Sequence, residues 1–530
     1  MSKIDRMSQA LLASWGQKGE CAEQVPLLKR NDQRSMLLHT MMYTACVLVL
    51  CLASACAIIY IMDREPSGVK HSVNVCNDPC SVVLLESIPE GLHYPAPSPE
   101  HNSIFQTWLE LLGSAKTSLD VASFYWTLRD SDLGLNFTSA WQGKQVFDKF
   151  LSLPSKGVAI QIATDGSKNS RKRSKKDVQD LENKGKSTRF TMYIHNPLDL
   201  GVAYTNLGIC SLCVSGHLRA GATVRAVDFD KLTTGVLHTK MWVVDLKHIY
   251  VGSANMDWRS LTQVKELGVV LYNCSCLARD VQKVFLEYWW LGQPGATIPK
   301  PWPEKFSTNI NQENPLHVNL NGTPSTLFFT SSPHQLCPSG RTEDLTAIVT
   351  TINNANEFVY IAVMDYVAAS LYGAHHKFWP MIDDALRHAA LDRNVEVKLL
   401  TSCWPHTNLA SFFFLQSLQA LDGIFGHAHI NTKFFITPAS KEQQKIPYAR
   451  VNHNKYMVTD KAAYIGTSNW SKDYFTNTAG VALVINQTAS LGQGLTVQEQ
   501  MRAVFLRDWN SPFTVAPSTL ADLQRVCRHP

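Results

Sequence analysis

The sequence has no strong excess of charge of either sign. Its 530 residues include 49 lysines and arginines against 44 aspartates and glutamates, which gives a formal net charge of +5. Such a mild charge does not indicate a nucleic-acid partner by itself, and it removes only the objection that a polyanion would be repelled. The length and the 45% hydrophobic content predict large buried cores, in two similar domains or one large pseudo-symmetric domain.

Charged residues are missing altogether from residues 41–62. The length of this run matches the roughly 20 residues with which a helix crosses the hydrocarbon layer. A cleaved signal peptide usually has a shorter apolar core and a shorter leader, so we expect a permanent transmembrane helix. Lys29, Arg30 and Arg34 precede the run, whereas Asp63, Arg64 and Glu65 follow it. The positive-inside bias then predicts a cytosolic N-terminus and a luminal or extracellular remainder.

The tail before this run contains the pattern Glu23-Gln24-Val25-Pro26-Leu27-Leu28. It has the form of an acidic dileucine sorting signal, in which Glu23, Leu27 and Leu28 are the defining residues. Its position shortly before a membrane span favours this interpretation. We therefore expect sorting adaptors as partners of the tail.

The cysteines beyond the apolar run lack the spacing of most zinc sites. They include two close pairs, Cys76/Cys80 and Cys274/Cys276, and the second pair has only one residue between its members. The predicted compartment is oxidising, so disulfides are the better interpretation. Spacing alone does not determine which cysteines pair.

Asparagine sequons occur on the same side of the predicted span. We expect glycosylation at Asn136, Asn273, Asn321 and Asn486. A fifth sequon begins at Asn469, inside the repeated motif described below, where burial should prevent modification.

The rest of the chain is an internal duplication. Expected strands and helices recur in the same order, at residues 117–125, 145–153 and 157–163 and again at 357–365, 381–389 and 394–400. Strands alternating with helices indicate an α/β sandwich in each half. The proline-rich residues 299–303 mark a junction between the halves.

These features predict a simple order of parts. We expect a cytosolic tail at 1–40, the transmembrane anchor at 41–62, a stalk at 63–85, a first lobe at 86–303 and a second lobe at 304–530.

The first half carries a segment that the second half lacks. From the second strand to the next strand-like run, the first half takes 58 positions (163 to 221) and the second takes 29 (400 to 429). The extra residues lie at about 184–216, and they are either a surface insertion or translated intron. Sequencing of spliced transcripts would distinguish the two. The basic run at 168–176 just before them is expected to be a solvated loop.

One short pattern occurs twice. The first copy has His238, Lys240 and Asp245 followed by Gly252-Ser253-Ala254-Asn255, and the second has His453, Lys455 and Asp460 followed by Gly466-Thr467-Ser468-Asn469. On a strand, residues two apart point to the same face, so each His should lie beside its Lys. Two complete copies are strong grounds for a catalytic role.

This doubled pattern resembles the signature of the phospholipase D superfamily. The resemblance is greatest to phospholipase D family members 3 and 4, and it rests on residues 86–92, 122–128, 235–276 and 446–474. It implies two phospholipase D-type lobes that share one active site. It also implies a type II membrane glycoprotein that passes through endoplasmic reticulum and Golgi to endosomes and lysosomes. Its activity would be that of an acid 5′→3′ exonuclease on single-stranded DNA and RNA, which limits nucleic-acid sensing.

The residue types predict a mechanism without a metal or other cofactor. His238 would attack phosphorus and form a phosphohistidine, while protonated His453 would donate to the leaving oxygen. Lys240 and Lys455 would bind the non-bridging oxygens together with Asn255 and Asn469, and Ser253 and Ser468 are further candidates for phosphate binding or support. Asp245 and Asp460 end their strands, and the family implies a supporting role for them.

The two halves differ at one charged position. Glu266 follows the first motif, whereas the second half has Thr478-Ala479-Gly480-Val481 there. Glu266 is therefore a candidate to orient a catalytic imidazole. We assign the nucleophile to His238 on this asymmetry and on the resemblance.

The resemblance also implies a disulfide pattern. Cys76 and Cys80 would pair with Cys276 and Cys274, and Cys403 would pair with Cys527, which leaves Cys337 unpaired.

The substrate is the least determined feature of the sequence. Trp126, Trp258, Trp470 and Tyr474 lie near the motifs and could stack on bases, but they are as readily explained as core residues. A lysosomal enzyme that transfers the phosphoryl group of phospholipids is the first alternative, and a non-catalytic membrane glycoprotein is the second. Whether the chain forms a homodimer stays open.

Overall fold

The computed structural model describes residues 73–132, 136–183, 221–372, 375–487 and 494–528, with side chains from residue 176 onward in the helix at 168–183. The predicted transmembrane anchor at 41–62, the sorting signal with Glu23, Leu27 and Leu28, and the extra segment at 184–216 lie outside these ranges. No helix within the described ranges has both the length and the apolar character that a membrane crossing needs.

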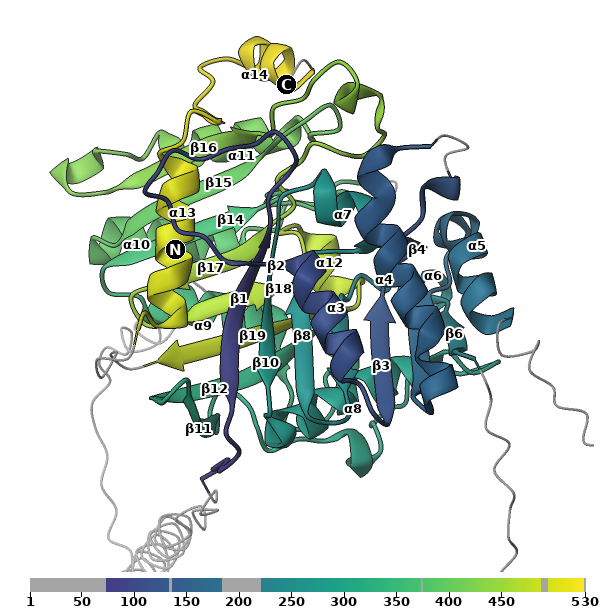
Figure 1. Ribbon diagram of the computed structural model, residues 1–530. Coiled ribbons are helices and arrows are strands. Elements are labelled where there is room, and N and C mark those ends of the chain that lie inside the picture. The colour runs from purple at the N-terminus through teal and green to yellow at the C-terminus, as the bar shows by residue number, and fades with distance from the viewer. Residues whose placement is uncertain (1–72, 133–135, 184–220, 373–374, 488–493, 529–530) are drawn as a thin grey trace, which may run out of the picture. The chain divides into compact units, whose positions relative to one another are not determined.

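The first half builds an eight-stranded sheet (Figure 1). Its strands β3 and β5 are parallel, and β7 and β8 run antiparallel beside them. The spatial order is β2 (Asn102–Ser103), β1 (Ser81–Ser87), β10 (Glu266–Tyr272), β8 (His248–Gly252), β7 (Met241–Val244), β3 (Ser118–Ser123), β5 (Ala159–Asp165) and β6 (Thr223–Val227). The strands predicted at 117–125 and 157–163 are present as β3 and β5.

The second half repeats this order in a ten-stranded sheet. The spatial order is β11 (Leu316–Leu320), β12 (Thr323–Ser332), β19 (Gly480–Gln487), β18 (Ala463–Gly466), β17 (Lys455–Thr459), β14 (Phe358–Val363), β15 (Glu396–Cys403), β16 (Ile430–Ile436) and β20 (Thr514–Val515), and β13 (Thr342–Glu343) pairs with β12. In spatial order, the strands β12, β19, β18, β17, β14, β15 and β16 correspond to β1, β10, β8, β7, β3, β5 and β6. This correspondence confirms the duplication. A short sheet of β4 (Trp126–Thr127) and β9 (Met256–Asp257) joins two segments of the first half.

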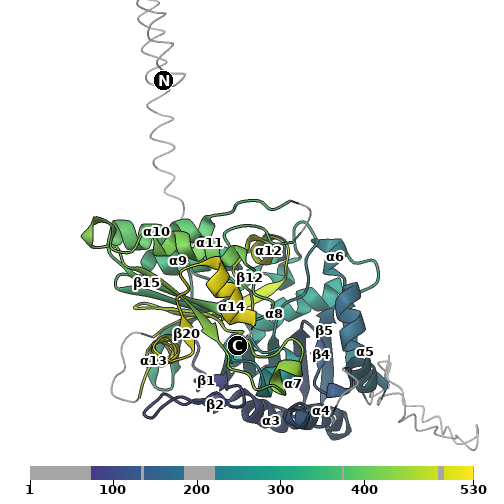
Figure 2. The same cartoon turned by 90° about the horizontal axis from the view of Figure 1, so that it is seen from above.

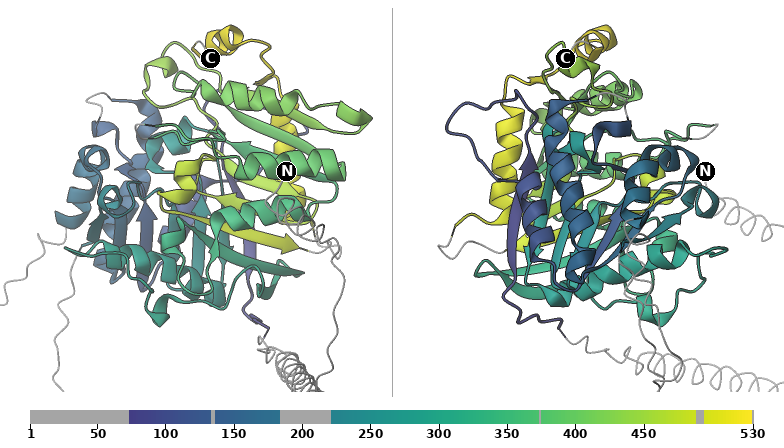
Figure 3. Two further views of the ribbon diagram at one scale, coloured as in Figure 1. Left: turned by 180° about the vertical axis from the view of Figure 1, so that it is seen from behind. Right: turned by 45° about the vertical axis from the view of Figure 1, so that its right-hand side comes forward.

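Helices cover both sheets. In the first half these are α3 (Ile104–Ser114), α4 (Trp141–Ser152), α5 (Lys168–Asn183), α6 (Phe229–Leu232), α7 (Trp258–Thr262) and α8 (Ser275–Leu291). In the second half they are α9 (Asp344–Asn354), α10 (Met381–Arg393), α11 (Ala410–Gln419), α12 (Lys472–Thr476), α13 (Val497–Trp509) and α14 (Leu520–Arg528). Figure 2 shows α3 and α4 side by side along the first half, and the left view of Figure 3 shows α9, α10 and α11 over the second sheet.

The alternation of side chains along the strands sorts them into two packed layers. On β7, Trp242 and Val244 pack in the layer that contains α3 and α4, whereas Met241 and Val243 face the layer that contains α8. Period-two alternation of this kind requires both faces of the sheet to be covered, so all four residues are buried.

Local signals fix several helix ends. Ser103 caps α3 by accepting the backbone N–H of Gln106, and Thr496 and Glu499 form a reciprocal capping box at the start of α13. The predicted helix at 381–389 is present as α10 and ends at Asn394 in the left-handed conformation.

Two expected boundaries need correction. Strand β1 begins at Ser81, inside the predicted stalk at 63–85, because its backbone pairs with β10 from Ser81↔Tyr272 onward. The basic run at 168–176 is helical rather than a loop, since α5 spans Lys168–Asn183. Lysine and arginine are good helix formers, and this stretch contains no glycine or proline to interrupt it.

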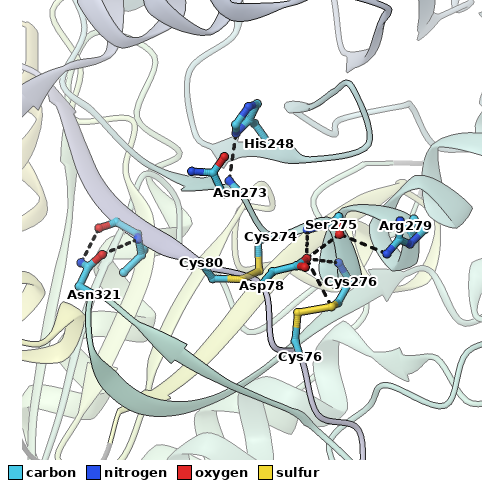
Figure 4. The surroundings of a disulfide bond; sticks show 11 residues. Cys76, Asp78, Cys80, His248, Asn273, Cys274, Ser275, Cys276, Arg279 and Asn321 are labelled. Carbon is cyan, nitrogen blue, oxygen red and sulfur yellow. Dashed lines mark hydrogen bonds between the residues drawn. A yellow bond between two sulfur atoms is a disulfide. The ribbon is translucent and has the colours of Figure 1, made fainter.

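Two disulfides attach the first described residues to the start of α8 (Figure 4). Cys76 pairs with Cys276 and Cys80 pairs with Cys274, as predicted, and these bonds remove the four sulfurs as zinc ligands. Between them, the carboxylate of Asp78 accepts the backbone N–H of Ser275 at 2.6 Å, which satisfies a free donor at the helix N-terminus.

The third predicted disulfide, Cys403–Cys527, joins α14 to the end of β15. Cys337 is the free cysteine among the described residues, also as predicted.

The predicted glycosylation sites differ in accessibility. Asn136 and Asn321 are exposed, and Asn273 and Asn486 are half-buried. Asn321 bonds through its amide to both backbone groups of Val82, so it also tethers the β11–β12 turn to β1. Asn469 is 4% exposed, which confirms the burial expected for the fifth sequon.

Candidate active site

Each catalytic motif is anchored to the opposite lobe. His238 lies in an extended segment before β7, and its backbone N–H donates to the carbonyl of Ala479 at 2.9 Å, just before β19. His453 lies before β17 and donates to the carbonyl of Lys265 at 2.8 Å, just before β10. The two bonds are related by the duplication, and they bring both motifs to the seam between the sheets. The predicted single shared site follows from this exchange.

The ring of His238 is held by a neutral acceptor. Its Nδ1 lies 2.8 Å from the carbonyl oxygen of Thr467. A carbonyl can only accept, so Nδ1 carries the proton and Nε2 of the neutral ring keeps its lone pair. Burial, together with the charges of Lys240, Lys455 and His453, lowers the pKa of His238 well below its usual value.

The ring of His453 is held by a carboxylate instead. Its Nδ1 lies 2.8 Å from Oε2 of Glu266, which also accepts the Ser253 hydroxyl at 2.5 Å, while Oε1 accepts the Ser260 hydroxyl at 2.8 Å. Burial lowers the pKa of His453, and the Glu266 carboxylate opposes that effect by stabilising the imidazolium.

Glu266 holds a catalytic imidazole, as predicted, and the structure places its carboxylate on His453. The sequence names no ring for Glu266, and the asymmetry that we use to assign the nucleophile to His238 acts on the other ring. The reason is the crossing of the lobes, since Glu266 starts β10 beside the backbone of the other motif. Ser253 supports Glu266 rather than reaching toward a phosphate.

The matching position in the second half has no carboxylate. This position is Gly480, where an added Cβ would lie 2.3 Å from Oγ of Ser468 and 2.8 Å from Oγ of Ser332, so a side chain there would require both hydroxyls to move. The His238 ring is held by a backbone carbonyl instead. The asymmetry between the two imidazoles is thus built into the packing of the two strands.

The two lysines are buried beside the histidines. Lys240 and Lys455 donate to the carbonyl oxygens of His238 and His453 at 2.5 and 2.7 Å. Burial lowers the pKa of Lys455 to about 7 against the opposing charges of Glu266 and Asp365, and burial with the nearby Lys455 also lowers the pKa of Lys240 well below its usual value. Two crowded cations of this kind would be stabilised by a bound anion such as a phosphate.

The two motif asparagines flank the lysines. Asn255 donates weakly to the Tyr125 hydroxyl at 3.4 Å, and Asn469 donates to Asp365 and to Tyr474, each at 3.2 Å. Within the described residues, Oδ1 of both asparagines and Oγ of Ser468 are buried without a hydrogen-bond partner. The Ser468 hydroxyl can donate to a phosphate oxygen, whereas the two amide oxygens can only accept from a donor on a ligand.

Sequence reasoning missed Asp365. It occupies the position that Tyr125 has in the first half, and burial raises its pKa to about 6 although Lys455 opposes the shift. The signal is present when the opening strands of the two halves are aligned, because the acid Asp365 then matches the tyrosine Tyr125. Because both residues contact the motif asparagines, Asp365 belongs to the site.

Asp245 and Asp460 lie away from the histidine rings. Asp245 accepts the backbone N–H groups of Thr117 and Ser118 at 2.8 and 2.9 Å, and Asp460 accepts that of Asn356 at 2.9 Å. They hold the turns that lead into β3 and β14, in line with the supporting role that the resemblance implies.

The aromatic residues near the motifs divide into two groups. Trp126, Trp258 and Trp470 are at most 1% exposed and belong to the core, so they offer no ring face to a base. Phe124 and Tyr474 each lie 5.1 Å from the His238 ring, centroid to centroid, and form the wall of the site.

Comparison with known proteins agrees with this geometry. The family described as "PLD3/4, PLD-like domain" matches residues 213–440, and that described as "Cardiolipin synthase, PLD-like domain" matches residues 108–289. The chain is 48% identical to the human 5'-3' exonuclease PLD3 over 88% of this chain and 87% of that protein. It is 48% identical to the Xenopus tropicalis PLD3 (85% and 84% covered) and 44% identical to the mouse 5'-3' exonuclease PLD4 (83% and 80% covered). The chain belongs to the PLD3/PLD4 family of the phospholipase D superfamily.

Proposed function

We propose that this protein is a 5′→3′ exonuclease that hydrolyses single-stranded DNA and RNA through a phosphohistidine intermediate. One observation carries the proposal: the two catalytic rings have opposite partners, a carbonyl for His238 and a carboxylate for His453. The first arrangement favours a neutral nucleophile and the second favours a proton donor.

In the first step, the lone pair on Nε2 of His238 attacks phosphorus. The bond from phosphorus to the leaving oxygen breaks, and that oxygen takes the proton from Nε2 of His453. Glu266 stabilises the imidazolium before the transfer. Lys240 and Lys455 neutralise the non-bridging oxygens as charge develops there, with Asn255 and Asn469 beside them.

In the second step, water attacks the phosphohistidine. His453 now takes a proton from the water, the bond between phosphorus and His238 breaks, and the nucleophile regains its lone pair. Both histidines return to their starting states, so each cycle consumes one phosphodiester bond and one water molecule.

The names of the relatives support the substrate and its polarity. Human PLD3 and mouse PLD4 are 5'-3' exonucleases, and the identity extends over most of both chains.

We also propose the setting that the sequence predicts. Residues 41–62 would anchor the chain as a type II membrane protein, the dileucine signal would direct it to endosomes and lysosomes, and the catalytic part would be glycosylated and luminal. Degradation of nucleic acid there would limit its sensing. Replacing Leu27 and Leu28 by alanine should move the protein to the cell surface, and unchanged lysosomal staining would contradict the sorting proposal.

The activity is tested with purified protein, at pH ~5 with EDTA, on 5′-hydroxyl oligonucleotides labelled at the 3′ end. We expect stepwise shortening from the 5′ end that is lost in both His238→Ala and His453→Ala. Rapid denaturation during turnover of a substrate labelled at its first internucleotide phosphate should trap the label on the unaltered protein and not on His238→Ala, which would identify the nucleophile. Internal cuts, or equal activity in a histidine variant, would contradict the mechanism.

A phospholipid substrate is tested in parallel with lipid vesicles. Contacts between lysines and phosphates weaken as salt rises, so nucleic-acid cleavage should fall steeply with ionic strength. Turnover of lipid without turnover of oligonucleotide would replace the exonuclease by the lipid enzyme.

A further inference from the structure

A cavity lies apart from the catalytic residues, and we call it the second cavity to distinguish it from the active site. It encloses about 380 Å³ and is lined by the loop that runs from Ala439 to Arg450, by Trp404 to His406, and by Arg528 at the end of α14. None of the histidines, lysines or asparagines of the two motifs lines it.

One wall of the cavity is a pair of stacked rings. The rings of His406 and Tyr448 lie 5.0 Å apart at an angle of 20°, and Trp404 meets His406 edge-on at 4.7 Å. Tyr448 is 54% exposed although it is aromatic, so one ring face is covered by His406 while much of the rest is accessible. An exposed aromatic face beside a cavity is a stacking platform for a nucleobase.

The charge of the cavity suits a nucleic acid. Its charged residues, among the described residues that line it, are Arg450 and Arg528, and no carboxylate faces it. Arg450 is held in place by the Pro438 carbonyl and by the side chain of Gln263. Arg528 is exposed and can attract the phosphates that flank a stacked base, whereas Arg450 is buried and its charge is partly offset by Glu90.

The cavity wall and the catalytic centre share one support. Arg259 on α7 donates to the Pro447 carbonyl at 3.0 Å, and Arg450 donates its backbone N–H to the Gln263 carbonyl at 3.1 Å. Two residues later, Lys265 holds the backbone of His453. The stacking wall is therefore positioned by the same short segment that positions the proton donor.

The distance along the chain is also short. Five peptide units join Tyr448 to His453, so their Cα atoms are at most about 18 Å apart. Tyr448 and Arg450 both have left-handed backbones, with φ of 56° and 55°. Non-glycine residues in this conformation are uncommon, and these two give the loop the shape that lines the cavity.

We propose that this cavity binds a nucleobase of the substrate strand, beyond the nucleotide that carries the scissile phosphate, with Tyr448 and His406 as the stacking platform. The inference rests on the exonuclease activity proposed above, and it adds a site that would hold the strand between successive cuts.

The test compares Tyr448→Gly with the unaltered full-length protein. Glycine removes the ring and tolerates φ above zero, so the substitution does not strain the loop. We expect KM for an octanucleotide to rise about 5- to 150-fold, the range that stacking of one base contributes. The rise should be at least fivefold smaller for a dinucleotide, which is too short to reach both sites. Phe413→Ala removes another exposed ring, on α11, and should leave KM unchanged.

Abasic substrates locate the base. In a series of octanucleotides, a single abasic site is placed at each position in turn. At one position the missing base should raise KM for the unaltered protein but should not raise it further for Tyr448→Gly. The same position should have no additional effect on KM for His406→Ala. If wild type degrades the strand and both variants show the same KM as Phe413→Ala at every length, the cavity is not a base site. If wild type degrades no oligonucleotide, the proposed function itself fails.

Discussion

Single residues give the two halves of this site different chemistry. Gly480 stands where the first half has Glu266, and the duplicated frame thereby supports two imidazoles with different partners. One residue difference, Gly480 on β19 against Glu266 on β10, thus separates nucleophile from proton donor, although both motifs keep the same His, Lys and Asp.

The first prediction at this scale concerns Glu266. In Glu266→Gln, His453 loses the negative charge that opposes its low pKa, so the alkaline limb of the pH profile should move to lower pH. The rate should fall about 100-fold, at the lower end of what a general acid contributes. The measurement is kcat/KM from pH 4 to 8. Ser260→Ala removes one bond to the same carboxylate but keeps the charge, so it should leave the limb in place.

The second prediction concerns Lys455. Burial lowers its pKa to about 7, so the free protein loses this positive charge as pH rises through that value. Because His453 loses its proton first, the logarithm of kcat/KM should fall with slope −1 and steepen to −2 above about pH 7. Lys455→Arg keeps its charge at every accessible pH and should lack the break at about pH 7. A slope of −1 throughout in the unaltered protein would contradict the role of Lys455.

At the scale of elements, the decisive feature is the seam where the two lobes exchange backbone bonds. Gly235 lies at this seam, and an added Cβ would come within 2.0 Å of the carbonyl oxygen of Asn477. Only two residues further on, Ala479 holds the backbone of His238. Close packing here is therefore tied to the placement of the nucleophile.

The third prediction uses this contact. Gly235→Ala should cost about 1–3 kcal/mol of unfolding free energy by overpacking, and it should lower kcat as Asn477 shifts. Gly113→Ala is the matched control, because it lies exposed on α3 with only Lys149 atoms within 4 Å and should stabilise by about 0.5–1 kcal/mol. Thermal unfolding and kcat of both variants are measured together. Wild-type values for Gly235→Ala would show that the seam is not tightly packed.

The fourth prediction concerns the Cys403–Cys527 bond between β15 and α14. In Cys527→Ser, α14 loses its covalent tie, and stability should fall by about 2–5 kcal/mol. Limited proteolysis should then cut near residue 520 first. Arg528 lines the second cavity, so KM for long oligonucleotides should rise as well.

Across the whole molecule, buried carboxyl groups favour acid conditions. Burial raises the pKa of Asp120, Asp344 and Asp365 to about 6 each. The unfolded chain releases these protons near pH 4, whereas the folded protein keeps them until about pH 6. The stability they contribute is therefore complete below about pH 4 and is lost as pH rises to about 6.

The fifth prediction tests one of these groups. Asp344 accepts from Thr330 and Tyr464 through a single oxygen, and an amide oxygen can accept both bonds. Asp344→Asn should thus keep the fold. Between pH 4 and 7, the free energy of unfolding should fall by about 2–3 kcal/mol less in this variant than in the unaltered protein. Melting temperatures across this range check it. An unchanged slope would mean that Asp344 ionises normally.

Sequence patterns predicted what depends on local spacing. The duplicated strands and helix α10 follow from the alternation of apolar and polar residues. Both motifs follow from the repetition of one short pattern, while the disulfide pairs came from family resemblance. The partner of Glu266 could not be found in this way, because its bond to His453 joins residues 187 positions apart. Asp365 was missed for the same reason, since its contact with Asn469 depends on how two loops meet.

The paired disulfides near Asp78 also determine how a mechanical load would enter the protein. A pull on the chain ahead of Val75 would meet the Cys76–Cys276 bond before it could peel β1 from β10. The Cys80–Cys274 bond would share that load within four residues, and both would pass it to the first turn of α8. Tension on the chain ahead of Val75 would therefore enter the fold at α8 rather than at the pairing of β1 with β10.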